Sequence, residues 1–202
     1  MPIAIERLLI ATGIGALAFV AALRLDATIG ERRAKEDLAI DFARSLEAIP
    51  PDTTEWSASR RIAWQASRKT GSGTPLGVLS ITSIGLSVAL LEGTDELTLN
   101  RGVGRVAGTQ LETNLAIAGH RDGFFRGLRN VAPGDRIRLE TPGAAYEYEV
   151  RSLSIVSPED VSVLEPTPEP TLTLVTCYPF FALGPAPKRF IVHAVRIGDA
   201  PS

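Results

Sequence analysis

Cysteine and histidine are scarce in this 202-residue chain, which has one cysteine, Cys177, and two histidines, His120 and His193. A single cysteine excludes an intrachain disulfide, and these residues lack the ligand spacing of a zinc or other transition-metal site. We therefore expect no metal and no cofactor. Charge of one sign is lacking as well, because 21 Lys and Arg face 23 Asp and Glu, and this balance argues against a nucleic-acid partner.

The N-terminal segment Leu8 to Leu23 has no charged residue over sixteen positions, and Arg7 and Arg24 flank it. At about 1.5 Å per residue it would span about 24 Å of the roughly 30 Å hydrocarbon core of a bilayer. We interpret residues 1–28 as a membrane anchor, an uncleaved signal anchor formed by one transmembrane helix. The alternatives are a cleaved signal peptide, with small residues at Ala16 and Ala18, and a buried core helix.

Residues 29–74 are predicted to form a helical and flexible linker. One helix would end at Pro50 and Pro51, and a second would cover Glu55 to Lys69. Trp56 and Trp64 would lie near one face of the second helix, and we favour a packing role for them over a binding surface. The composition TGSGTP at residues 70–75 indicates a domain boundary there.

From residue 75 to 198, short β-rich segments alternate with turn residues. The expected strands are Leu76 to Ile81, Leu86 to Leu91, Leu115 to Ala118, Arg136 to Glu140, Ala145 to Ser157, Leu172 to Thr176 and Arg189 to Ile197. This pattern predicts an all-β fold, a single closed or nearly closed barrel with few helices.

Cys177 could be a small buried hydrophobic residue or a nucleophile at the end of a strand. Exported cysteines are normally paired, and this one has no partner in the chain. Cysteine chemistry on an acyl group needs a base and a group that stabilises the tetrahedral oxyanion. His120 and Arg189 could supply these functions, because all three residues fall at ends of predicted strands and a barrel could bring them to one rim.

The sequence TLVTC at residues 173–177 resembles the TLxTC signature of sortases, the membrane-anchored cysteine transpeptidases that attach proteins to cell-surface amines. Residues 75–197 resemble class D sortases more widely. The similar stretches are LNRGVGRVAGT (99–109), AGHRDGFFRGLRN (118–130), GDRIRLET (134–141), the run from 156 to 180, and APKRFIV (186–192).

The resemblance implies an eight-stranded sortase-type β-barrel and a role for each matching residue. Cys177 matches the nucleophile, His120 the proton donor and acceptor, and Arg189 the contact to the substrate carbonyl and the oxyanion. Thr176 matches a position that supports the oxyanion hole through its backbone or hydroxyl. His193 departs from the expected pattern and would place a second imidazole on the face of Arg189, but we assign the catalytic role to His120.

The expected function is cleavage of an LPxTx-like C-terminal sorting signal, formation of a thioester at Cys177, and transfer of the protein to an amine acceptor of the cell envelope or a pilin. No cofactor is implied, and no acidic cluster indicates the calcium site that some sortases use. The alternatives are a thiol hydrolase that resolves the thioester with water and a non-catalytic adaptor. The catalytic domain is expected outside the cell membrane, although the charges that flank residues 8–23 favour the opposite orientation if taken literally.

Overall fold

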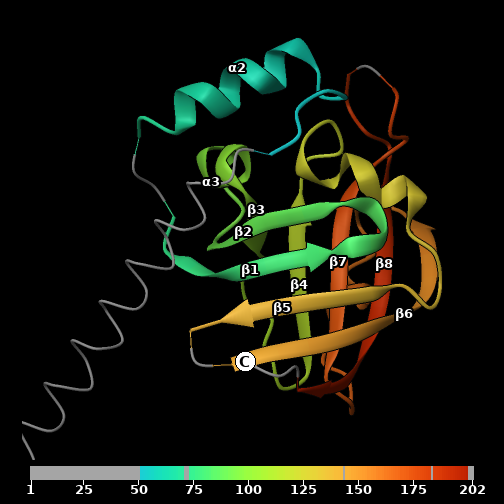
Figure 1. The fold of residues 1–202 in the computed structure, drawn as a ribbon. Helices are drawn as coiled ribbons and strands as arrows, with labels where there is room; N and C mark the ends of the chain where they lie inside the picture. The colour runs from blue at the N-terminus through green and yellow to red at the C-terminus, as the bar shows by residue number, and fades with distance from the viewer. Residues whose placement is uncertain (1–50, 71–72, 143, 183, 200–202) are drawn as a thin grey trace, which may run out of the picture. The chain divides into compact units, whose positions relative to one another are not determined.

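Eight strands close into a barrel in the computed structural model, which describes residues 51–70, 73–142, 144–182 and 184–199 (Figure 1). The strands are β1 (Pro75–Ile81), β2 (Leu86–Glu92), β3 (Val103–Arg105), β4 (Asn114–Gly119), β5 (Arg136–Thr141), β6 (Ala144–Val156), β7 (Thr171–Tyr178) and β8 (Lys188–Asp199). Their order around the barrel is β1-β2-β3-β4-β7-β8-β6-β5. The predicted all-β barrel is confirmed.

Each of the seven predicted strands corresponds to an observed strand, and β3 is the eighth. Strand β3 was missed because it has only three residues, one of them glycine, which is too short for an alternating pattern. The helix α3 (Glu96–Arg101) was also missed. It has six residues, and it begins after Asp95, whose carboxylate accepts hydrogen bonds from the backbone amides of Leu97 and Thr98.

Alternation along the strands separates the core from the outer face of the barrel. On β4, Leu115 and Ile117 belong to the buried core, and the alternate residues point away from it. The same holds on β7, with Leu172 and Leu174, and on β8, where the core residues are Phe190, Val192 and Ala194. Along these three strands, every second side chain therefore faces the core, and the side chains between them face the outer surface.

The strands β4, β7 and β8 are neighbours in the barrel (Figure 1). β4 and β7 are parallel, and Gly119 at the end of β4 pairs with Thr176. β7 and β8 are antiparallel, and Cys177 pairs with Arg189. The end of β4, the end of β7 and the start of β8 therefore meet at one end of the barrel.

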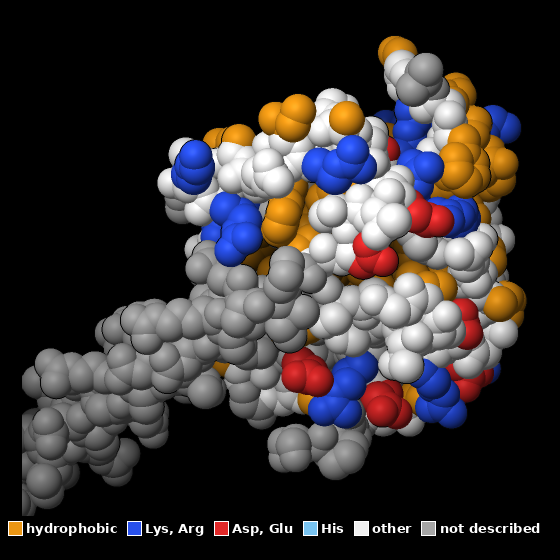
Figure 2. Space-filling view, turned by 45° about the horizontal axis from the view of Figure 1, so that its top comes forward, with side chains coloured by type: hydrophobic (Ala, Val, Ile, Leu, Met, Phe, Trp, Pro, Cys, Tyr) orange, Lys and Arg blue, Asp and Glu red, His pale blue; other side chains and the backbone are white. Residues whose placement is uncertain are grey.

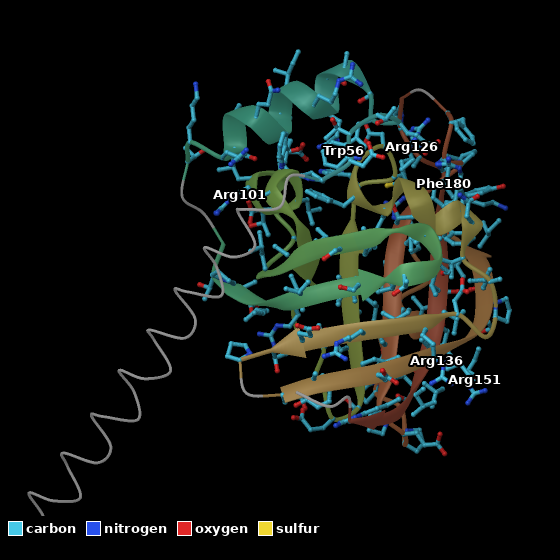
Figure 3. The ribbon with its side chains drawn as sticks, viewed as in Figure 1. Trp56, Arg101, Arg126, Arg136, Arg151 and Phe180 are labelled. Atoms are coloured by element: carbon cyan, nitrogen blue, oxygen red, sulfur yellow. The ribbon has the colours of Figure 1, made fainter. Side chains whose placement is uncertain are left out.

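The helix α2 (Ala58–Ser67) belongs to the same compact unit as the barrel. It is shorter than the expected helix because the Ser57 hydroxyl caps it by accepting a hydrogen bond from the Arg60 amide. Trp56 therefore precedes the helix, but its ring still contacts Trp64, with 6.2 Å between the centroids. Trp56 also packs edge-on against Phe124 at 4.7 Å, beneath α2 (Figure 3). The packing role proposed for the tryptophans is confirmed.

The predicted anchor, residues 1–28, and the first part of the predicted linker lie outside the described residues. Within the described ranges, no helix combines the length and apolar character needed to cross a membrane.

Candidate active site

His120 directly follows β4, and two local features hold it there. Gly119 is required before it, because a Cβ at this position would lie 2.6 Å from the ring of the fully buried Phe125. The chain then turns at once, since the His120 carbonyl accepts hydrogen bonds from the amides of Gly123 at 3.1 Å and Phe125 at 3.2 Å. The seven-residue 3₁₀ segment η2 (Phe124–Asn130) begins after this turn.

Cys177 is the second-last residue of β7 and is half-buried as a free thiol. The strand runs two residues further than its predicted end, so Cys177 lies within the hydrogen-bonded ladder rather than beyond it. The preceding Thr176 is buried, and its hydroxyl donates a 2.7 Å hydrogen bond to the Gly119 carbonyl. This bond ties the residue before the thiol to the residue before His120.

Arg189 is the second residue of β8 and the cross-strand partner of Cys177. Its Nη1 donates to the carbonyls of Ala186 at 3.3 Å and Lys188 at 3.1 Å. These carbonyls lie just before β8 and at its first residue, so the guanidinium stays at the end of the barrel where Cys177 is found.

The three predicted site residues lie at one end of the barrel. Gly119, directly before His120, pairs with Thr176, directly before Cys177, and Cys177 pairs with Arg189. Cys177 and Arg189 alternate with the core residues of β7 and β8, so their side chains lie on the outer face. The fold therefore brings the three residues to the same end of the barrel.

His193 lies on the same face of β8 but at a distance from this end. It pairs with Thr173, four residues before Cys177 on β7. At about 3.3 Å per residue, this separation is roughly 13 Å along the strands. The geometry therefore favours His120 as the imidazole that serves Cys177.

Three charged side chains that sequence reasoning did not single out surround His120. Glu96 Oε2 lies 3.4 Å from His120 Nε2, which is buried and has no partner with hydrogen-bond geometry. Burial lowers the pKa of His120 below its ordinary value, and the Arg60 guanidinium lowers this pKa further. Glu96 and Asp122 act in the opposite direction and partly offset the shift. The net effect favours the neutral imidazole.

Arg121 links the His120 turn to the loop between β7 and β8. Its Nη1 donates to the Pro179 carbonyl at 3.0 Å, and its Nη2 donates to the carbonyls of Ala182 at 2.9 Å and Gly184 at 2.7 Å. This loop connects the strand of Cys177 to the strand of Arg189. Phe180 lies at the same end of the barrel as Trp56, whereas Arg136 and Arg151 lie toward the other end (Figure 3).

The loop between β6 and β7 crosses the outer face farther from Cys177. Asn114, at the start of β4, donates from Nδ2 to the carbonyls of Val163 and Glu165, each at 3.0 Å. Its Oδ1 accepts a 2.8 Å hydrogen bond from the Thr173 hydroxyl. The loop, which contains the 3₁₀ turn η3 (Ser162–Leu164), is thereby fixed over β4 and β7.

The described part of the chain contains no group of three or more His, Cys, Asp and Glu side chains placed to hold a metal ion. The candidate catalytic groups at this end of the barrel are a thiol, an imidazole and a guanidinium. Such a set is suited to acyl transfer through a covalent thioester. The class of protein that this fold and site define is a cysteine acyl-transfer enzyme on a closed β-barrel.

Comparison with known proteins identifies the family. The Sortase domain model matches residues 79–197. Sortase D of Bacillus subtilis (strain 168) is 34% identical over 137 residues, which cover 66% of this chain and 69% of the relative. Sortase SrtE1 of Streptomyces coelicolor is 32% identical over 151 residues, which cover 64% of this chain and 42% of that protein.

Solved structures agree with this relationship. Sortase E1 from Streptomyces coelicolor, solved with a tripeptide in the active site, has a TM-score of 0.56 and 30% identity, and the match covers 63% of this chain and 90% of that one. A Clostridium perfringens Sortase D5 transpeptidase has a TM-score of 0.59 over 81% of this chain and 98% of that chain, and at 24% identity it supports the fold alone. The chain belongs to the sortase family of cysteine transpeptidases, and its likeness to Sortase D supports the class D resemblance.

Proposed function

We propose that this sortase cleaves an LPxTx-like C-terminal sorting signal of exported proteins and transfers the protein to an amine acceptor. The observation that carries the proposal is that His120, Cys177 and Arg189 lie at the adjoining ends of three neighbouring strands. The tripeptide in the active site of the related Sortase E1 structure supports a peptide substrate.

In the first half of the reaction, His120 takes the proton of the Cys177 thiol, a role suited to a neutral imidazole. The thiolate attacks the carbonyl carbon of the threonine-like residue of the signal. The Arg189 guanidinium stabilises the oxyanion, and Thr176 supports this arrangement by tying β7 to the end of β4. His120 then gives its proton to the departing amine, which leaves a thioester on Cys177.

In the second half, an incoming amine attacks the thioester carbonyl. His120 accepts the proton that the amine loses and returns it to the departing Cys177 sulfur. The protein is then joined to the acceptor by an amide bond, and the thiol and the neutral imidazole are restored. The cycle needs no cofactor. Water in place of the amine would give the hydrolase that we consider as the alternative.

The choice between transfer and hydrolysis can be tested with a library of LPxTx-like peptides, incubated with and without a small amine such as triglycine. We expect one group of peptides to be cleaved and, when the amine is present, most of the acyl product to appear as the new amide. Mass spectrometry distinguishes the amide from the free acid. Free acid alone at saturating amine would reject transfer in favour of hydrolysis, and cleavage of no peptide would reject the sorting-signal substrate.

We also propose that residues 1–28 anchor the chain in the cell membrane by a single span, with the catalytic domain outside. The support is the uncharged segment from Leu8 to Leu23 and the chemistry of the site, which acts on exported proteins. In intact cells with the outer envelope layers removed, we expect added protease to degrade the barrel while a cytoplasmic marker survives. A barrel that resists the protease until the cells are lysed would contradict this orientation.

A further inference from the structure

Arg60, on the helix that precedes the barrel, joins two carboxylates beside the active-site histidine. Its Nε donates to Asp122 Oδ1 and its Nη1 to Glu96 Oε1, each at 3.2 Å, and Nη1 also contacts Asn100 Oδ1. The Arg60 side chain is only 15% exposed. A guanidinium buried to this degree with two carboxylates is a built arrangement rather than a solvated surface charge.

Each carboxylate is linked to His120 by a different route. Glu96 receives Arg60 on Oε1 and faces His120 Nε2 with Oε2, at 3.4 Å. Asp122 lies two residues after His120, in the turn closed by the hydrogen bond from the Gly123 amide to the His120 carbonyl. The Ser57 hydroxyl, at the start of α2, donates to the other oxygen of Asp122 at 3.0 Å. Arg60 thus contacts both Glu96, which faces the His120 ring, and Asp122, which belongs to the turn that carries His120.

The space between Arg60 and His120 is also closely fitted. Gly123 lies between them, because a Cβ at this position would be 3.3 Å from Arg60 Cγ and 3.5 Å from His120 Cβ. Contacts at 3.3 Å are tight, so a larger residue at position 123 would push against the Arg60 stem. The aliphatic part of Arg60 therefore packs over the turn, and its charged head reaches the carboxylates.

We propose that Arg60 is a positioning residue of the active site, through which α2 holds Glu96 and the His120 turn in place and sets the balance between the neutral and the protonated imidazole. The apolar attachment of α2 is separate, because it uses Trp56 and Trp64. Lys and Arg side chains are spread over the face of the molecule seen in Figure 2. Arg60 is more buried than the other basic residues on or beside α2, because Arg61, Arg68 and Lys69 are exposed.

The charges around His120 define the signs of the expected effects. The charged groups that act on it are Arg60 from α2, Glu96 from α3 and Asp122 from the turn after β4, and Cys177 on β7 and Arg189 on β8 lie at the same end of the barrel. A positive charge disfavours the imidazolium and a negative charge favours it. Removing the charge of Arg60 should therefore raise the pKa of His120, and removing the charge of Glu96 should lower it.

The test is an NMR titration of the His120 ring in the full chain, with His193→Gln to assign the second imidazole. A Cys177→Ala background removes the reactive thiol from the measurement. We expect Arg60→Gln to raise the pKa of His120 by about half a unit or more and Glu96→Gln to lower it by a similar amount. The matched control is Arg68→Gln, at the other end of α2, where the guanidinium lies 5.3 Å from the Trp64 ring. The control should leave the pKa unchanged.

A rate measurement separates positioning from charge alone. Arg60→Lys keeps the charge but loses the fork that holds two carboxylates at once. With Cys177 present, we expect Arg60→Gln and Arg60→Lys both to lower the kcat/KM for acylation by a peptide substrate about tenfold, mainly through kcat. Only the Lys variant should keep the pKa of His120 near that of the unaltered chain. Melting temperatures identify any variant that has lost α2.

The proposal would be overturned if His120 had the same pKa in the Arg60→Gln and Arg68→Gln variants. It would also be overturned if Arg60→Gln and Glu96→Gln shifted this pKa in the same direction. An Arg60→Lys variant with the full acylation rate would overturn the positioning role. The rate measurement rests on the proposed acyl-transfer function, whereas the titration does not. If the unaltered chain accepts no peptide, the proposed function fails and the titration still decides the role of Arg60.

Discussion

Cys177→Ala is expected to abolish formation of the acyl-enzyme with any peptide substrate. The substitution removes the sulfur that forms the thioester, and no other cysteine in the chain can replace it. The alanine side chain fits where the half-buried thiol lay, so the barrel should keep its melting temperature. Intact-protein mass spectrometry of the reaction with a substrate-like thiol reagent measures the effect, with full modification of the unaltered chain and none of the variant.

Cys177→Ser is the matched control for this experiment. A serine keeps a polar hydroxyl close to the position of the thiol but is a much weaker nucleophile at neutral pH. We expect it to bind peptide while forming little or no acyl-enzyme. A folded Cys177→Ala variant that still released cleaved peptide at the rate of the unaltered chain would show that the nucleophile lies elsewhere.

His120→Ala and Arg189→Ala are each expected to lower kcat/KM at least about a hundredfold, the usual scale for a lost acid and base or a lost oxyanion donor. Two variants on β8 provide matched controls. His193→Ala removes the other imidazole, roughly 13 Å further along the strand. Arg196→Ala removes a guanidinium that lies 4.1 Å from the Tyr146 ring, seven residues beyond Arg189. Both controls should keep most of the activity in the same peptide assay.

The outcomes of these four variants discriminate between the two histidines and between two kinds of arginine effect. An inactive His193→Ala variant beside an active His120→Ala variant would refute the assignment of His120. Arg189→Lys adds a further distinction, because lysine keeps the charge and loses the planar fork. Partial recovery in Arg189→Lys is expected if charge near the oxyanion is the main contribution, and a loss as deep as that of Arg189→Ala would point to the fork geometry.

The strands could be predicted, and three candidate site residues proposed, because their signals are local. Alternating apolar residues recur in each long strand, and turn residues separate them, so each segment indicates its own structure. The TLVTC stretch and the single cysteine identified Cys177, and His120 and Arg189 were found because each lies at the end of such a segment. The strand β3 and the helix α3 were missed because three and six residues carry too little periodic pattern.

The sequence by itself therefore determined the barrel and indicated the candidate groups of the site, and the tertiary structure decided what surrounds His120. Glu96 stands in the first turn of a short helix, where an acidic residue is common and its side chain is 68% exposed. Arg60 is one of several basic residues on or beside α2, and nothing in the local pattern distinguishes it from Arg61. Its partners are 36 and 62 residues away in the chain. Local propensity cannot encode such contacts, because they exist only after closure of the barrel has brought α2, α3 and the His120 turn to the same end.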